Sequence, residues 1–140
     1  MRLFLAINLP EDIRRDLFLV GQEFEDYGRM NPVEEENIHL TLKFLGEAEA
    51  EPVINALKEI KFKPFGLSLK GLGAFPDLDY IKVLWAGVER GFDESIELNK
   101  IIDEKLPEFG EKKSYHPHAT LGRVESLRDK EGLLEFIDEK

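Results

Sequence analysis

The spacing of apolar residues along the chain follows two different periods, and each period predicts one kind of element. Where every second residue is apolar, as in half-buried strands, we predict strands over residues 2–8, 37–45, 65–69, 81–88 and 114–124. Where apolar residues recur three and four positions apart, we predict helices over residues 11–27, 50–60, 92–106 and 127–137. This order of elements favours an α+β fold with largely antiparallel sheets.

Proline and glycine mark the boundaries of these elements. Pro10 suits the first turn of the first helix, and Gly28 is expected to close that segment. We interpret Asn31-Pro32 as a break between elements, the Gly-Leu-Gly segment at 71–73 as a bend, and Pro76-Asp77 as the start of a hairpin turn.

One phrase of four residues occurs twice, as HLTL at 39–42 and HATL at 118–121, and two of the three histidines head these copies. Side chains two positions apart in a strand share a face, so His39 lies beside Thr41 and His118 beside Thr120. The residues between them point into the core, and the same alternation places Phe44 in the core. Two polar His/Thr pairs backed by apolar residues indicate the two halves of one site.

The composition limits the classes of protein to which the chain can belong. A length of 140 residues predicts one compact domain over 1–140, composed of two lobes. The absence of cysteine excludes disulfides, thiolate catalysis and cysteine-ligated zinc. The net charge of −10 argues against a protein that coats nucleic acid, but it allows an enzyme that recognises one phosphate in a local pocket.

The sequence has no segment that resembles a membrane span or a leader. No stretch approaches the roughly 18 apolar residues that a transmembrane helix needs. The opening MRLFLAINLPED reads as a strand and not as a signal peptide, because acidic residues follow the short apolar run at once. We therefore expect a cytoplasmic protein with no membrane partner.

Two histidines on one face suit the cleavage of a phosphodiester near neutral pH, because the ordinary pKa of imidazole is about 6.5. One neutral ring takes a proton from water or a ribose hydroxyl, and the other gives a proton to the leaving oxygen; each role typically contributes about 10²–10⁴-fold. The threonines can donate hydrogen bonds to the phosphate oxygens on which charge develops. Such a site needs no metal and no cofactor.

For the other polar residues near the two phrases, the sequence allows either a role in the site or a structural role. Lys43 shares the face of Thr41 and suits phosphate binding, or else it is a solvated lysine at the strand end. Arg123 binds phosphate if a twist or bulge turns it inward, or else it forms a structural ion pair. His116 is an auxiliary site candidate against a default of a surface histidine. Tyr115 and Trp85 have faces that suit base stacking, although we expect Trp85 to pack in the core.

A zinc site made by His39, His116 and His118 is the alternative to the two-histidine mechanism. That alternative gives no reason for a threonine two residues after each of two histidines, and no nearby carboxylate is evident to orient the ligands. It predicts that a chelator would abolish activity.

The residues of the two phrases resemble the 2H phosphoesterase superfamily, which is named for two H-x-[ST]-x motifs. More narrowly, the chain resembles the bacterial and archaeal RNA 2′,3′-cyclic phosphodiesterases, also called 2′-5′ RNA ligase-like proteins. The segments RLFLAINLPEDIR, ENIHLTLKFLGE, GLGAFPD, VLWAGVE and HPHATLGRV occur in that family in the same order. The resemblance implies a bilobal α+β fold, with two antiparallel sheets flanked by helices around a central cleft that carries both motifs.

The resemblance also implies an activity and roles for four residues. RNA ends that bear a 2′,3′-cyclic phosphate, tRNA fragments among them, would be hydrolysed to a 2′-phosphate without metal. His39 would be the proton donor and His118 the proton acceptor, while Thr41 and Thr120 would hold the phosphate. Family members are also associated with reversible 2′-5′ ligation of tRNA halves. No protein partner is evident.

Two alternative functions remain compatible with the sequence, and the chain departs from the family in one respect. The two motifs alone do not separate this activity from that of a 2H enzyme for ADP-ribose cyclic phosphate or 2′-5′ oligonucleotides. An inactive module that binds RNA ends is a function of a different class. Members of the family usually continue for some tens of residues past the second motif, whereas this sequence stops at Lys140. We therefore expect the family's C-terminal strands to be missing and one sheet to have an exposed edge.

Overall fold

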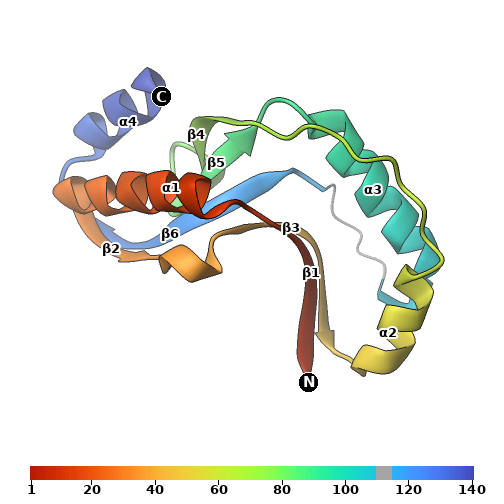
Figure 1. The fold of residues 1–140 in the computed structure, drawn as a ribbon. Coiled ribbons are helices and arrows are strands. Elements are labelled where there is room, and N and C mark those ends of the chain that lie inside the picture. The colour runs from red at the N-terminus through yellow and green to blue at the C-terminus, as the bar shows by residue number, and fades with distance from the viewer. Residues whose placement is uncertain (110–114) are drawn as a thin grey trace.

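The computed structural model describes residues 1–109 and 115–140, and its strands form two antiparallel sheets (Figure 1). The smaller sheet pairs β1 (Arg2–Asn8) with β3 (His39–Glu47). The larger sheet has the order β2-β6-β5-β4, made by Gly28–Pro32, His118–Leu127, Ile81–Val88 and Leu69–Pro76. The predicted α+β class with antiparallel pairing is confirmed. Ser114, where we predicted the last strand to begin, lies outside the described residues.

Within the described residues, four helices flank the sheets, and each overlaps most of a predicted one. They are α1 (Glu11–Glu23), α2 (Ala50–Leu57), α3 (Phe92–Lys105) and α4 (Lys130–Glu139). Short 3₁₀ turns occur at Phe24–Tyr27, Glu35–Asn37 and Pro107–Phe109. In Figure 1, α1 and α4 lie beside the larger sheet, whereas α2 and α3 lie beside the smaller one. Within the described part of the chain, no helix has the length and apolar character that crossing a bilayer requires.

The apolar residues gather in two separate clusters, one for each sheet. The first joins the larger sheet to α1 and α4 and includes Leu84, Leu121 and Leu133, all at most 1% exposed. The second joins β3 to α2 and α3 and includes Leu42 and Ile102. Burying each such side chain contributes about 1.5–3 kcal/mol, so each sheet has a core of its own.

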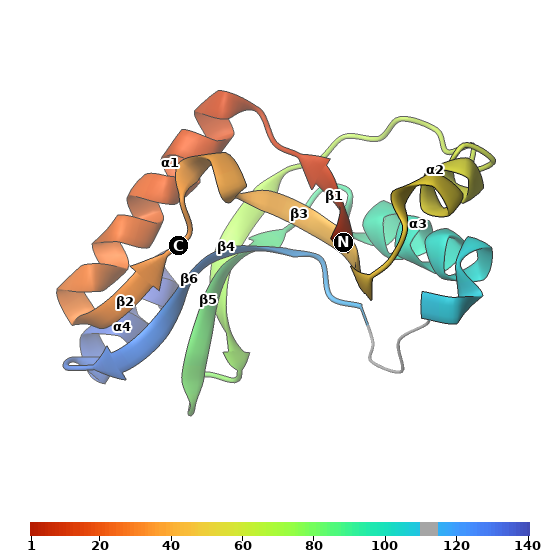
Figure 2. The ribbon, with the colours of Figure 1, turned by 90° about the horizontal axis from the view of Figure 1, so that it is seen from below.

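The two sheets meet along β3 and β6, which lie side by side in both ribbon views (Figure 2). The backbone N–H of Val33 donates a 2.8 Å hydrogen bond to the carbonyl of Leu121, so the segment between β2 and β3 is tied to the second phrase. The two strands that carry the repeated phrases therefore lie next to each other where the sheets meet, and this places the two phrases in one region of the fold.

A bulge follows the threonine at the same place in both phrases. In β3, Thr41 pairs with Ala6 and Lys43 pairs with Leu5, so Leu42 is the extra residue. In β6, Thr120 and Gly122 pair with successive residues of β5, so Leu121 is the extra residue. Each bulge reverses the alternation of faces beyond it.

The bulge in β3 contradicts one prediction from the sequence. Both Leu42 and Lys43 are buried, at 6% and 4% exposure, and Phe44 is 64% exposed. The expectation that Phe44 packs in the core was therefore wrong, because strict alternation does not hold past an inserted residue.

Two features of the larger sheet were also not predicted. Residues 28–32 form the edge strand β2, although Asn31-Pro32 was expected to be only a break; a proline is tolerated there because an edge strand has one unpaired side. Residues 65–68 are not in a strand, and β4 instead runs through the 71–73 segment. Gly73 faces Trp85 across the sheet, where a Cβ would lie 2.3 Å from the indole ring. Glycine is needed there for the ring to lie on the strand.

Candidate active site

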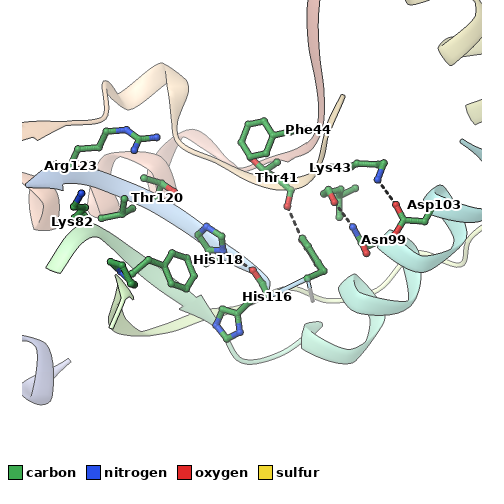
Figure 3. Close-up of a pocket in the computed structure, with 15 residues that line it drawn as sticks. Thr41, Lys43, Phe44, Lys82, Asn99, Asp103, His116, His118, Thr120 and Arg123 are labelled. Atoms are coloured by element: carbon green, nitrogen blue, oxygen red, sulfur yellow. Dashed lines mark hydrogen bonds and ion pairs between the residues drawn. The ribbon is translucent and has the colours of Figure 1, made fainter. Parts of the chain in front are cut away.

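A cavity of about 680 Å³ lies where the two phrases meet, and strands from both sheets together with α3 line it (Figure 3). Seven of the eight predicted site residues line this cavity: Thr41, Lys43, Tyr115, His116, His118, Thr120 and Arg123. The eighth, His39, is not among the lining residues. The structure therefore brings together most of the residues that sequence reasoning selected from separate segments.

His118 is held in one orientation by backbone and by aromatic rings. Its Nδ1 lies 2.6 Å from the backbone carbonyl of His116, so Nδ1–H is the donor and the neutral ring leaves an acceptor lone pair at Nε2. The ring of Phe75 packs edge-on at 4.8 Å between centroids, and Trp85 lies at 5.8 Å. Burial lowers the pKa of His118, although the hydrogen bond to His116 partly opposes this shift.

His39 begins β3 and is half-buried against an aromatic neighbour. Its ring stacks on Phe4, with 4.8 Å between centroids and an angle of 17° between the planes. The Phe4 ring also lies 6.2 Å from Phe44, which lines the cavity. Burial lowers the pKa of His39, and a hydrogen bond to the backbone of Asn37 partly opposes it.

Two side chains hold the bulge of the first phrase from outside β3. The hydroxyl of Tyr115 donates a 2.7 Å hydrogen bond to the carbonyl of Thr41, and burial raises the pKa of Tyr115 to about 12. Asn99 on α3 donates through Nδ2 to the carbonyl of Leu42 at 2.6 Å. These bonds satisfy the carbonyls of two successive residues at the bulge, so they support the position of Thr41.

Lys43 lines the cavity, but its charge already has a partner. Its ammonium group forms an ion pair with Asp103 on α3, and the lysine side chain is only 2% exposed. Asn99 and Asp103 are four residues apart and therefore share a face of α3. Sequence reasoning missed both residues, although polar side chains at this spacing on an otherwise inward-facing stretch of the helix were a usable signal.

Arg123 faces the cavity because of the bulge at Leu121, which is the condition that the sequence placed on its phosphate role. It occupies the same position in the second phrase that Phe44 occupies in the first, five residues after the histidine. Within residues 1–109 and 115–140, no acidic side chain forms an ion pair with Arg123. Lys82, which sequence reasoning did not select, also lines the cavity.

The rings of His116 and Trp85 lie beside that of His118, and of these two residues His116 lines the cavity. The exposed ring of His116 lies 5.1 Å from Trp85 and 5.8 Å from Phe92. Trp85 pairs with Thr120 across the sheet and is only half-buried, so the expectation that it packs in the core was wrong. Leu84 lies on the core face of β5, and alternation therefore places the next residue, Trp85, on the opposite face.

The described residues do not provide a metal-ligand cluster. Over residues 1–109 and 115–140, no group of three or more His, Asp or Glu side chains is close enough to hold an ion, and the three histidines do not form one. The alternative of a zinc site made by His39, His116 and His118 is therefore not supported by their placement.

Comparison with known proteins identifies the family of the chain. The family described as LigT-like phosphoesterases matches residues 7–85, which is more than half of the chain. The chain belongs to the LigT-like phosphoesterase family. An RNA 2′,3′-cyclic phosphodiesterase of Methanocaldococcus jannaschii is 40% identical over 141 residues, covering 99% of this chain and 80% of the relative. One from Archaeoglobus fulgidus is 38% identical, covering 89% of this chain and 73% of the relative.

Solved structures of LigT-like phosphoesterases share the fold. A protein from Thermus thermophilus superposes with a TM-score of 0.76 at 30% identity, covering 90% of this chain and 75% of that protein. Escherichia coli LigT in complex with 3′-AMP gives a TM-score of 0.70 at 31% identity, covering 91% and 73% of the two chains. The family resemblance and the fold inferred from the sequence are thus both confirmed.

Proposed function

We propose that this LigT-like phosphoesterase hydrolyses RNA ends that carry a 2′,3′-cyclic phosphate and leaves a 2′-phosphate. The observation that carries the proposal is that Thr41 of the first phrase and His118 and Thr120 of the second line one cavity, with the same bulge after each threonine. The curated relatives named as RNA 2′,3′-cyclic phosphodiesterases support the substrate class.

In this proposal His118 is the proton acceptor. Its Nδ1–H is committed to the carbonyl of His116, so the free Nε2 of the neutral ring is the atom that takes a proton from the attacking water. Its lowered pKa keeps the ring neutral near pH 7, in the form that a base requires. The water oxygen then bonds to phosphorus while the bond from phosphorus to O3′ breaks.

His39 is the proton donor to the departing O3′. A lowered pKa makes its protonated ring a stronger acid, and a bound phosphate anion favours the protonated form. Since His39 stacks on Phe4 and does not line the cavity, the proposal includes a turn of this side chain from Phe4 toward Thr41 when substrate binds. The products are a 2′-phosphate monoester and a 3′-hydroxyl, and the two histidines exchange protonation states.

The threonines and one cation are proposed to hold the phosphate. Thr41 and Thr120 offer hydroxyl donors from opposite strands of the cavity, and Arg123 offers a charged fork. Lys43 also faces the site, but its ion pair with Asp103 makes it a weaker phosphate ligand than Arg123. Tyr115 and His116 are auxiliary: Tyr115 holds Thr41, and His116 orients His118 through its carbonyl.

The proposal also covers the domain organisation, the cellular location and the range of RNA substrates. We expect one domain of two lobes over residues 1–140, a view that the two apolar clusters support. We also expect a cytoplasmic location, tRNA fragments among the RNA ends, and 2′-5′ ligation as the reverse of a related cleavage. Cell fractionation and incubation with 2′,3′-cyclic-phosphate tRNA halves test these points.

The deciding experiment incubates chelator-treated protein with an oligoribonucleotide that ends in a 2′,3′-cyclic phosphate and identifies the position of the product phosphate. A 2′-phosphate, formed by the wild type and lost in His39→Ala and His118→Ala, is the expected result. A 3′-phosphate would contradict the assignment of the leaving oxygen. Turnover of ADP-ribose cyclic phosphate or 2′-5′ oligonucleotides alone would favour another 2H substrate, and binding without turnover would favour an inactive RNA-end module.

A further inference from the structure

We propose that Lys82, with Arg123, forms a second phosphate subsite that selects oligonucleotide ends over single nucleoside 2′,3′-cyclic phosphates. This inference rests on the proposed function and names the class of substrate for the same cavity. Because the cyclic phosphate terminates the chain at its 3′ side, the next phosphate of such a substrate is the phosphodiester on the 5′ side of the terminal nucleotide.

A local irregularity of β5 turns Lys82 into the cavity. Phe75 pairs with Val83 and Pro76 pairs with Ile81, so Lys82 is an extra residue between two paired positions. Val83 in turn pairs with Arg123 on β6, which brings the two cations onto adjacent strands. Both line the cavity, and in Figure 3 they lie together at the end opposite Lys43 and Asp103.

The charge of this end of the cavity is not neutralised by the described part of the protein. Neither Lys82 nor Arg123 forms an ion pair within residues 1–109 and 115–140, and the Lys82 ammonium lies 5.2 Å over the ring of Tyr80. Lys43, at the other end, is paired with Asp103. In a chain of net charge −10, two adjacent unpaired cations in one cavity repel each other, and an anion bound between them relieves that repulsion.

The separation from the catalytic threonine favours a second phosphate over a single one. Thr120 and Arg123 pair with Trp85 and Val83, which are two residues apart on β5, so the bulge at Leu121 leaves a separation along the strand of roughly 7 Å at about 3.3 Å per residue. Arg123 is long enough to reach back to the cyclic phosphate from this position, whereas Lys82 lies on the adjacent strand β5, beside Arg123 at the end of the cavity (Figure 3). A substitution of Lys82 therefore tests binding of the second phosphate separately from binding of the cyclic phosphate.

The test compares three substrates: a nucleoside 2′,3′-cyclic phosphate, a dinucleotide with the same end, and that dinucleotide with a neutral methylphosphonate in place of its phosphodiester. For the wild type we expect kcat/KM on the charged dinucleotide to exceed that on the other two by about 10- to 100-fold, as a charged hydrogen bond to phosphate provides. Lys82→Gln is expected to remove most of this preference. Lys58→Gln, the same change at an exposed lysine at the end of α2, is the matched control and retains the preference.

Salt and binding measurements make the outcome specific. We expect kcat/KM on the charged dinucleotide to fall less steeply with added salt in Lys82→Gln than in the wild type, because one ionic contact is lost. Calorimetric binding of dinucleotides that end in a 2′-phosphate, with charged or neutral linkage, tests the subsite even without turnover. The subsite would be overturned if Lys82→Gln kept the preference of the wild type for the charged dinucleotide. It would also be overturned if the substitution lowered kcat/KM equally on the charged and neutral dinucleotides. Either result would leave the proposed function standing. Absence of product from all three substrates, with charge-dependent binding retained, would instead overturn the hydrolase and leave the subsite.

Discussion

The hydroxyl of Tyr115 donates a 2.7 Å hydrogen bond to the backbone carbonyl of Thr41, and this bond joins the approach to the second phrase with the middle of the first. The accepting carbonyl lies next to the bulge at Leu42, where the regular pairing with β1 is interrupted. The position of one threonine of the site therefore depends on a residue that lies close to the other histidine in sequence.

We expect Tyr115→Phe to lower both the free energy of unfolding and kcat/KM. Loss of this hydrogen bond costs about 0.5–1.5 kcal/mol of unfolding free energy, with somewhat more if the carbonyl stays dry. Because Thr41 is proposed to contact the phosphate, we also expect kcat/KM to fall by roughly tenfold. Urea unfolding and steady-state kinetics measure the two effects. A stability loss with unchanged kcat/KM would assign Tyr115 a structural role alone.

Substitution of the three histidines separates side-chain chemistry from backbone support. We expect His118→Ala and His39→Ala each to reduce kcat by about 10²–10⁴-fold, the usual contribution of a general acid or base. His116→Ala is the matched control, since its contact with Nδ1 of His118 is made by a backbone carbonyl that alanine keeps. An equally large loss in His116→Ala would show that its ring takes part in the reaction.

The environment of His118 predicts the acidic limb of the pH profile. Burial lowers the pKa of this ring, so the base form appears at a lower pH than for a free imidazole. We expect kcat/KM to rise with pH through a midpoint below about 6.5. Phe75→Ala exposes the ring, so its pKa should rise and the midpoint should move upward. NMR titration of the imidazole checks the assignment, and an unchanged midpoint in Phe75→Ala would contradict it.

The pair of Lys43 and Asp103 should contribute to stability more than to substrate binding. Asp103→Asn leaves a lysine that is 2% exposed without its charged partner, and we expect a loss of roughly 1–3 kcal/mol in unfolding free energy. Glu104→Gln, an exposed neighbour on α3 for which the described residues show no ion pair, is the control. Chemical denaturation of both variants gives the comparison. Equal stabilities would show that water or another group solvates Lys43 after the substitution.

Much of the fold followed from local pattern, and the errors have a common cause. Strand β5 runs over Ile81–Val88 as predicted, because its residues are apolar and β-branched and turn residues precede it. Phe44 and Trp85 were wrongly predicted to lie in the core, because each prediction assumed which face of its strand packs against the core. Strand β2 was missed because its pairing with β6 compensates for a weak local signal and a terminal proline.

The sequence by itself determined the class of the fold, and it was sufficient to select the residues for which we propose the chemistry. Repetition of H-x-T-L, with apolar residues at alternate positions, was sufficient to select His39, Thr41, His118 and Thr120. Only the tertiary structure decided which side chains share the cavity with them. Bulges at Leu42, Lys82 and Leu121 turn Phe44, Lys82 and Arg123 toward the cavity, and Asn99 reaches the first bulge from a distant helix. A bulge is a mismatch between two strands, so it depends on the partner's register and is not encoded in the alternation of either strand alone.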